Sequence, residues 1–87
     1  MMNKEITVKY NTSVYTPAGW RSAEVTAIAN QTSAKRCVVS QVLDINGDGN
    51  TGYKSRTGAK RQRYNCRGVS LREEGKIKNI SSLTVIE

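Results

Sequence analysis

The chain of 87 residues has no histidine and no phenylalanine, and only two cysteines, one proline and one tryptophan. Without histidine it lacks the commonest general base, the side chain that titrates near neutral pH, and the commonest zinc ligand. Two cysteines alone cannot complete a structural zinc site of four ligands. We therefore expect a protein that is not an enzyme and that needs no cofactor.

Long hydrophobic runs are also missing. No apolar stretch approaches the roughly 20 residues that cross a bilayer. Residues 1–10 alternate apolar and charged side chains, unlike a secretory signal peptide. We expect a cytoplasmic protein with no membrane partner. Cys37 and Cys66 are then expected to be reduced structural thiols, although the sequence leaves open whether they pair.

Acidic residues are scarce, with seven Asp and Glu against fourteen Lys and Arg, for a net charge of +7. All of this excess lies in residues 54–78, where nine lysines and arginines face only Glu73 and Glu74. Charge confined to one segment creates a local field that attracts polyanions or an acidic protein surface. The sequence therefore predicts a binding protein with a negatively charged partner.

The residues that are abundant are β-branched, because valine, isoleucine and threonine together number twenty-two. Branching at Cβ suits a pleated surface better than a helix. A chain of this length makes one domain. We predict a single all-β domain over residues 1–87, a small barrel or sandwich of five to six strands with at most one short helical turn.

The hydrophobic pattern places the strands. Period-two alternation and turn residues predict strands at Lys4–Tyr10, Trp20–Asn30, Arg36–Ile45, Thr51–Thr57, Tyr64–Leu71 and Thr84–Ile86. A short helix at Arg21–Ala29 is the alternative for the second strand. Residues 11–19 are expected to be a connector in which Val14 and Tyr15 can add a short strand. Residues 76–83 are expected to be a second connector with one 3₁₀ turn, and Gly68 to break or bulge its strand.

The end of the chain resembles a known architecture. The polar link Asn79-Ile80-Ser81-Ser82 before a three-residue strand resembles the end of an SH3-like barrel. The resemblance covers about ten residues and implies an SH3-like fold. A free strand at either edge of such a sheet can pair with a second copy, so a homodimer is possible.

The basic segment is the main candidate site. Lysine and arginine neutralise phosphates, and neighbouring tyrosines can stack on unpaired bases. We predict that RNA or DNA contacts Lys54, Arg56, Lys60, Arg61, Arg63 and Arg67 together with Tyr53 and Tyr64. The sequence does not distinguish RNA from DNA.

An acidic protein surface is the alternative partner. In that case the chain is a small inhibitor or adaptor of the kind that phages and mobile elements encode. Aromatic residues ringed by arginine commonly anchor such interfaces. The candidate anchors are Tyr15, Trp20 and Tyr53. The sequence leaves open whether Trp20 is an exposed anchor or part of the core.

A third pattern resembles a calcium loop. Asp44-Ile45-Asn46-Gly47-Asp48-Gly49 matches the first six positions of an EF-hand loop, but Ser55 stands where the twelfth position needs a carboxylate. Calcium ligands there would be Asp44, Asn46 and Asp48. The competing interpretation, which we favour, is a hairpin turn, because Asn-Gly and Asp-Gly are strong hairpin signals.

Overall fold

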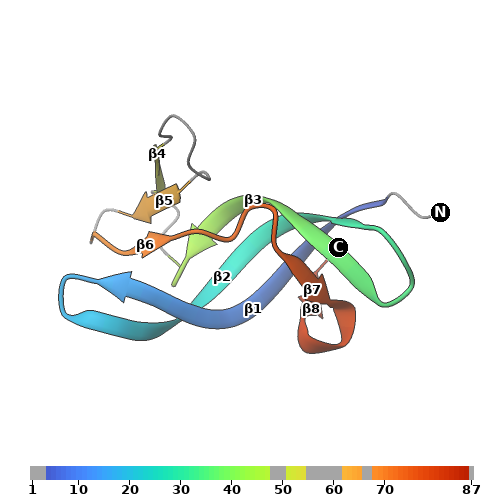
Figure 1. Ribbon diagram of the computed structural model, residues 1–87, viewed down its shortest axis with the longest axis horizontal. Helices are drawn as coiled ribbons and strands as arrows, with labels where there is room; N and C mark the ends of the chain where they lie inside the picture. The colour runs from blue at the N-terminus through green and yellow to red at the C-terminus, as the bar shows by residue number, and fades with distance from the viewer. Residues whose placement is uncertain (1–3, 48–50, 55–61, 66–67, 87) are drawn as a thin grey trace.

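The computed structural model describes residues 4–47 and 68–86 in full and the backbone of residues 51–54 and 62–65. These residues form one antiparallel sheet, shown in Figure 1. Its strands are β1 (Lys4–Thr16), β2 (Gly19–Gln31), β3 (Arg36–Ile45), β4 (Thr51–Lys54), β5 (Gln62–Asn65), β6 (Ser70–Leu71), β7 (Ile77–Asn79) and β8 (Thr84–Val85), with a 3₁₀ turn, η1 (Ile80–Ser82), before β8. The predicted all-β class and the late 3₁₀ turn are confirmed.

β1 and β2 form a long hairpin whose ladder runs from Lys4 opposite Gln31 to Thr16 opposite Gly19. The connector predicted at residues 11–19 is therefore wrong for most of its length, since only Pro17 and Ala18 form the turn. The strand considered at Val14 and Tyr15 is confirmed, as a continuation of β1. The strand continues because period-two burial continues: Val14 is as buried as the residues of the first half. Thr16 Oγ1 closes the turn by donating to the carbonyl of Gly19 at 2.6 Å.

The helical alternative for residues 21–29 is also wrong. Every second residue of β2 from Ala23 to Ala29 is buried, which is the period of a strand. Three of these four buried residues are alanines. Small side chains on the inner face let the strands that cross it approach closely.

β3 begins and ends where the sequence predicts, but it is irregular. Its register with β2 shifts twice, between Thr26 and Ala27 and between Ile28 and Ala29. Each shift is a bulge that bends the strand and increases its twist. The bulges explain why the buried positions of β3 are spaced by two and then three residues: Cys37, Val39, Val42 and Ile45.

The segment after β3 turns as predicted but pairs elsewhere. Asn46 and Gly47 both have positive φ, at 58° and 75°, which their residue types tolerate. β4 then pairs with β5 instead of returning along β3, and β5 pairs with β6. The predicted strand at residues 64–71 is interrupted as expected, because Gly68 has a φ of 81° and lies against Pro17. A Cβ at Gly68 would stand 3.3 Å from the Pro17 ring.

The last third of the chain returns to both sides of the long hairpin. β7 pairs with the start of β3, with Cys37 opposite Lys78, and β8 pairs with the middle of β1, with Val8 opposite Val85. The connector predicted at residues 76–83 thus contains a strand that sequence reasoning missed. Figure 1 shows the segment from β7 to β8 below β3 and β1, away from β4 and β5.

The core lies on the inner face of this curved sheet. It is aliphatic except for one tyrosine and one thiol, and it consists of Ile6, Val8, Tyr10, Val14, Ala23, Val25, Ala27, Ala29, Cys37, Val39, Val42, Ile45, Val69 and Leu71, with Ile80 and Leu83 packed against it. Ile80 is the first residue of η1 and Leu83 follows its last, so the 3₁₀ turn covers part of the core.

Shortening Ile45 tests this assignment. Ile45 is completely buried, whereas Ile77 in β7 is 67% exposed. Ile45→Val should lower the free energy of unfolding by about 0.5–1.5 kcal/mol because it leaves a methyl-sized gap. The matched change Ile77→Val should alter it by less than about 0.5 kcal/mol. Urea denaturation measures both, and equal losses would contradict the assignment of the core.

Candidate binding site at the tip of the long hairpin

Two large aromatic side chains lie uncovered at the closed end of the β1–β2 hairpin. Tyr15 and Trp20 are directly opposite each other in the ladder. Their ring centroids are 5.5 Å apart and the planes meet at 71°, an edge-to-face pair. The side chains nevertheless remain open to solvent, with Tyr15 54% and Trp20 67% exposed. The interpretation of Trp20 as a core residue is therefore wrong, and this tryptophan is available to a partner.

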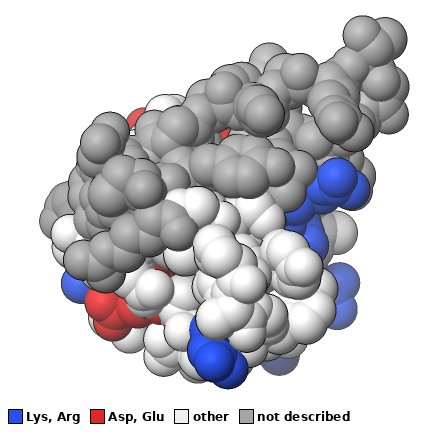
Figure 2. All heavy atoms as spheres, turned by 90° about the vertical axis from the view of Figure 1, so that its left-hand side faces the viewer, with Lys and Arg blue, Asp and Glu red and all other residues white. Residues whose placement is uncertain are grey.

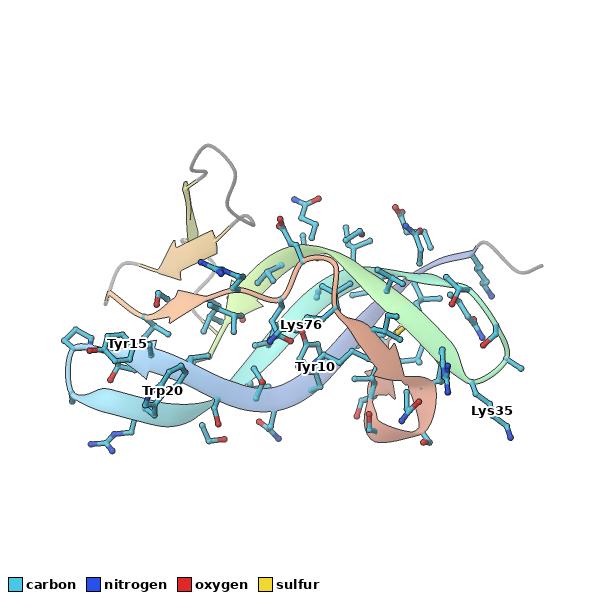
Figure 3. All side chains as sticks on the ribbon, viewed as in Figure 1. Tyr10, Tyr15, Trp20, Lys35 and Lys76 are labelled. Atoms are coloured by element: carbon cyan, nitrogen blue, oxygen red, sulfur yellow. The ribbon has the colours of Figure 1, made fainter. Side chains whose placement is uncertain are left out.

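A hollow of about 420 Å³ lies beside this pair. Residues from three parts of the chain line it: Ser13, Tyr15, Trp20, Ser70, Leu71, Arg72, Glu73 and Lys76. They meet because β6 pairs with β1 through Ser70 opposite Tyr15. In Figure 3, Tyr15 and Trp20 lie at one end of the sheet, Lys76 lies near its centre, and Lys35 lies at the far end.

Burial alternates along residues 69–73, and residues from both faces of this stretch line the hollow. Val69 and Leu71 are buried, while Arg72 is exposed. Arg72 forms no ion pair with any residue that the structure describes. The same alternation places Glu73 at a core position, where its carboxylate is 1% exposed.

Glu73 is stabilised there by three donors. Tyr10 donates its hydroxyl to Oε1 at 2.8 Å. The ammonium of Lys78 lies 2.9 Å from the same oxygen, and that of Lys76 lies 2.9 Å from Oε2. Lys78 also lies over the Tyr10 ring, 4.6 Å from its centroid, a cation–π contact. The buried negative charge is thus matched by two cations and a phenol, as a buried ion requires.

These contacts set the protonation states of the cluster. Burial alone would raise the pKa of Glu73, but the hydrogen bonds from Lys76, Lys78 and Tyr10 outweigh it and the pKa is lowered. Burial, followed by the hydrogen bond to Glu73, raises the pKa of Tyr10. Glu73 is therefore a carboxylate and Tyr10 a neutral phenol at physiological pH.

Because of this cluster, fewer positive charges of the basic segment are free to contact a partner than the sequence indicates. In the sequence, Glu73 counts as one of the two acidic residues of the basic segment and Lys78 as one of its nine cations. In the fold, Lys78 is 22% exposed and directed to Glu73, while Lys76 is 51% exposed and keeps donors for another partner. The alternation of Val69, Leu71 and Glu73 was the available signal that this glutamate faces the core.

The structure places the predicted nucleic-acid residues only in part. By backbone register Tyr53 lies opposite Arg63, Lys54 opposite Gln62, and Tyr64 opposite Ser70. Tyr64 therefore belongs to the row that continues through Ser70 and Tyr15 to Trp20. The predicted contacts Arg56, Lys60, Arg61 and Arg67 lie outside the described residues. Figure 2 shows this end of the molecule, with uncharged side chains at the centre of the described surface and both basic and acidic side chains at its margins.

The calcium candidates have other roles where they are described. Asp44 Oδ2 accepts the backbone N–H of Gly47 at 2.8 Å, and Asn46 Oδ1 accepts that of Glu24 at 3.0 Å. Both oxygens thus hold the turn together. Asp48 lies outside the described residues. Among the residues described, no three His, Cys, Asp or Glu gather as a metal site.

The predicted structural thiol is found at Cys37. It is a free cysteine, completely buried in the core. Burial raises its pKa, although Lys78 acts in the opposite direction. A protonated, inaccessible thiol is a packing residue. Cys66 lies outside the described residues.

Comparisons with protein-family models, curated proteins and solved structures found no match to this chain. In the part of the chain that the structure describes, no helix is long and apolar enough to cross a bilayer. The case for function therefore depends on the geometry of the site.

Removing the charge of Glu73 should weaken the fold. Glu73→Gln leaves Lys76 and Lys78 without their counter-charge and puts an amide where donors converge. We expect a loss of about 2–3 kcal/mol in the free energy of unfolding, below the value for a fully buried pair because both ammonium groups reach solvent. Glu5→Gln, at an exposed carboxylate, should change it by less than about 0.5 kcal/mol. Chemical denaturation compares the two variants.

Acid stability should report the same cluster. The pKa of Glu73 is lower in the folded protein than in the unfolded chain, where a glutamate titrates near 4.3. The unfolded state therefore binds this proton first, and the stabilisation is lost as pH falls below about 4.3 through the folded pKa. The free energy of unfolding should drop less over this range in Glu73→Gln than in the wild type or Glu5→Gln. Parallel curves for all three proteins would contradict the assignment.

Proposed function

We propose that this protein is a non-catalytic module that binds nucleic acid through the hairpin-tip site and the basic segment next to it. The observation that carries the proposal is an exposed aromatic pair, Tyr15 and Trp20, on a hollow that Arg72 and Lys76 also line. Aromatic rings offer surfaces for bases, and the cations beside them neutralise phosphates.

The strand order supports extending this surface to the basic segment. β6 joins β1 on one side and β5 on the other, and β5 pairs with β4. Of the predicted contacts, Lys54 ends β4 and Arg63 lies in β5, so both stand on strands that continue the sheet from the hairpin tip. On this proposal Tyr64 extends the row of Tyr15 and Trp20, and the segment's cations contact the backbone of the same ligand.

We further propose that the fold is an SH3-like barrel. The ladder from β8 through β1, β2 and β3 to β7, with η1 joining β7 to β8, supports this architecture. The two bulges of β3 supply the strong bend that closure of so short a sheet needs. Small barrels commonly bind nucleic acids on exposed strand faces.

A protein partner is the second candidate. Trp20 is 67% exposed, and interface hot spots are enriched in tryptophan, tyrosine and arginine. The chain would then act as an inhibitor or adaptor on an acidic protein surface. A pull-down with and without nuclease separates the two functions: a stoichiometric protein that survives nuclease treatment and high salt supports this candidate and contradicts nucleic-acid binding.

Salt dependence tests the proposed function. With about six phosphates engaged, affinity for DNA or RNA should fall roughly 10³-fold between 50 and 200 mM salt. Arg72→Gln should weaken binding to all sequences and reduce the slope of log affinity against log salt by about 0.7–0.9. Fluorescence anisotropy with labelled single-stranded and duplex oligonucleotides measures both effects.

The matched control is Arg36→Gln. Arg36 is also an exposed arginine, but it starts β3 at the opposite end of the sheet, next to Lys35 (Figure 3). This variant should bind like the wild type. Equal losses for both arginines would mean that only net charge matters, and a curve nearly flat in salt would contradict nucleic-acid binding.

A further inference from the structure

We propose that the hollow at the hairpin tip takes one unpaired base together with its phosphate, so that the protein selects single-stranded over duplex nucleic acid. This inference rests on the proposed function and names the ligand class of the same site. It follows from the arrangement of aromatic, hydroxyl and cationic groups around one cavity.

The aromatic side of the cavity suits a base. Tyr15 and Trp20 hold each other in an edge-to-face pair, yet more than half of each side chain stays exposed. The rings are thus fixed in place without being covered, which lowers the entropy lost when a base stacks on them. The cavity volume of about 420 Å³ lies within the usual range for small-ligand sites, about 300–1,000 Å³.

The opposite side of the cavity suits a phosphate. Arg72 is exposed and without an ion pair among the described residues. Lys76 is held by Glu73 at 2.9 Å through one of its three N–H groups, so two remain for a ligand. Because Glu73 is anchored by Tyr10 and Lys78, Lys76 is positioned before any ligand arrives.

The polar groups between these sides do not select one base. Ser13 and Ser70 line the hollow, and a hydroxyl both donates and accepts. Hydrogen bonds to a base edge are therefore possible for all four bases. We expect recognition of an unstacked base without strong sequence preference.

Duplexes cannot use this site fully. Their bases are stacked on one another and present only edges in the grooves, so the rings of Tyr15 and Trp20 have no base face to contact. A duplex retains only the phosphate contacts with the cations. Single strands, loops and ends retain both kinds of contact.

The test compares four ligands at one salt concentration: single-stranded DNA, single-stranded RNA, the matching duplex, and an abasic strand of equal length. Trp20 is the only tryptophan, so its fluorescence reports the site directly. We expect quenching by the two base-containing single strands and little by the duplex or abasic strand. Loss of one stacked base, worth about 1–3 kcal/mol, corresponds to roughly 5- to 150-fold weaker binding of the abasic strand.

Variants make the test specific. Because these variants lack the only tryptophan, their binding is measured by fluorescence anisotropy with labelled strands. Trp20→Ala should weaken single-strand binding by the same factor and remove the preference over the abasic strand, while Trp20→Phe should restore part of it. Ile77→Ala is the matched control, because Ile77 is an equally exposed apolar residue, at 67%, on β7. Since both side chains are exposed, the thermal transitions of these variants should match that of the wild type.

Two results would overturn the inference in different ways. Equal affinity for all four ligands, with steep salt dependence and no effect of Trp20→Ala, would leave a nucleic-acid-binding protein without a base site. Absence of binding to every ligand at 50 mM salt would overturn the proposed function as well. A preference for RNA over DNA would keep the inference and add recognition of the 2′-hydroxyl.

Discussion

The buried carboxylate of Glu73 is the interaction on which the arrangement of this protein depends. It receives the Tyr10 hydroxyl from β1, the ammonium group of Lys76 from the residue just before β7, and that of Lys78 from β7 itself. A charge that is 1% exposed is tolerated only when its partners are in place. The contacts therefore tie the C-terminal third of the chain to the long hairpin and hold Arg72 and Lys76 beside the aromatic pair.

Backbone bonds reinforce the same junction. The N–H of Gly75 donates to the carbonyl of Val39 at 2.8 Å, and the N–H of Val39 donates to that of Lys76 at 2.9 Å. The backbone of the turn after Glu73 is thus hydrogen-bonded to β3, whereas the carboxylate of Glu73 is hydrogen-bonded to Tyr10 of β1. One short segment spans the inner face of the sheet, and the hollow lies where this segment passes the end of the hairpin.

The cations described at the C-terminal end of the basic segment have different roles. Lys78 mainly balances a buried charge, Lys76 combines that role with exposure to the hollow, and Arg72 is open to solvent. Net charge alone overstates what is available to a partner. The aromatic pair and the open arginine give the site a chemistry that charge alone does not, because exposed aromatic rings and a cation line the same hollow.

Local patterns in the sequence determined the all-β class, the limits of β3, the turn at Pro17 and Ala18, and the 3₁₀ turn, because each depends on neighbouring residues through backbone preference and period-two burial. Tertiary structure alone decided the exposure of Trp20, the contact of Glu73 with Tyr10, the bulges of β3 and the pairing of β4 with β5. Each of these depends on which distant strand lies alongside. A single sequence carries no direct record of such contacts. The charged segment could be found because its residues are consecutive in the chain. The hollow could not, because it forms only when β6 pairs with β1 through Ser70 and Tyr15.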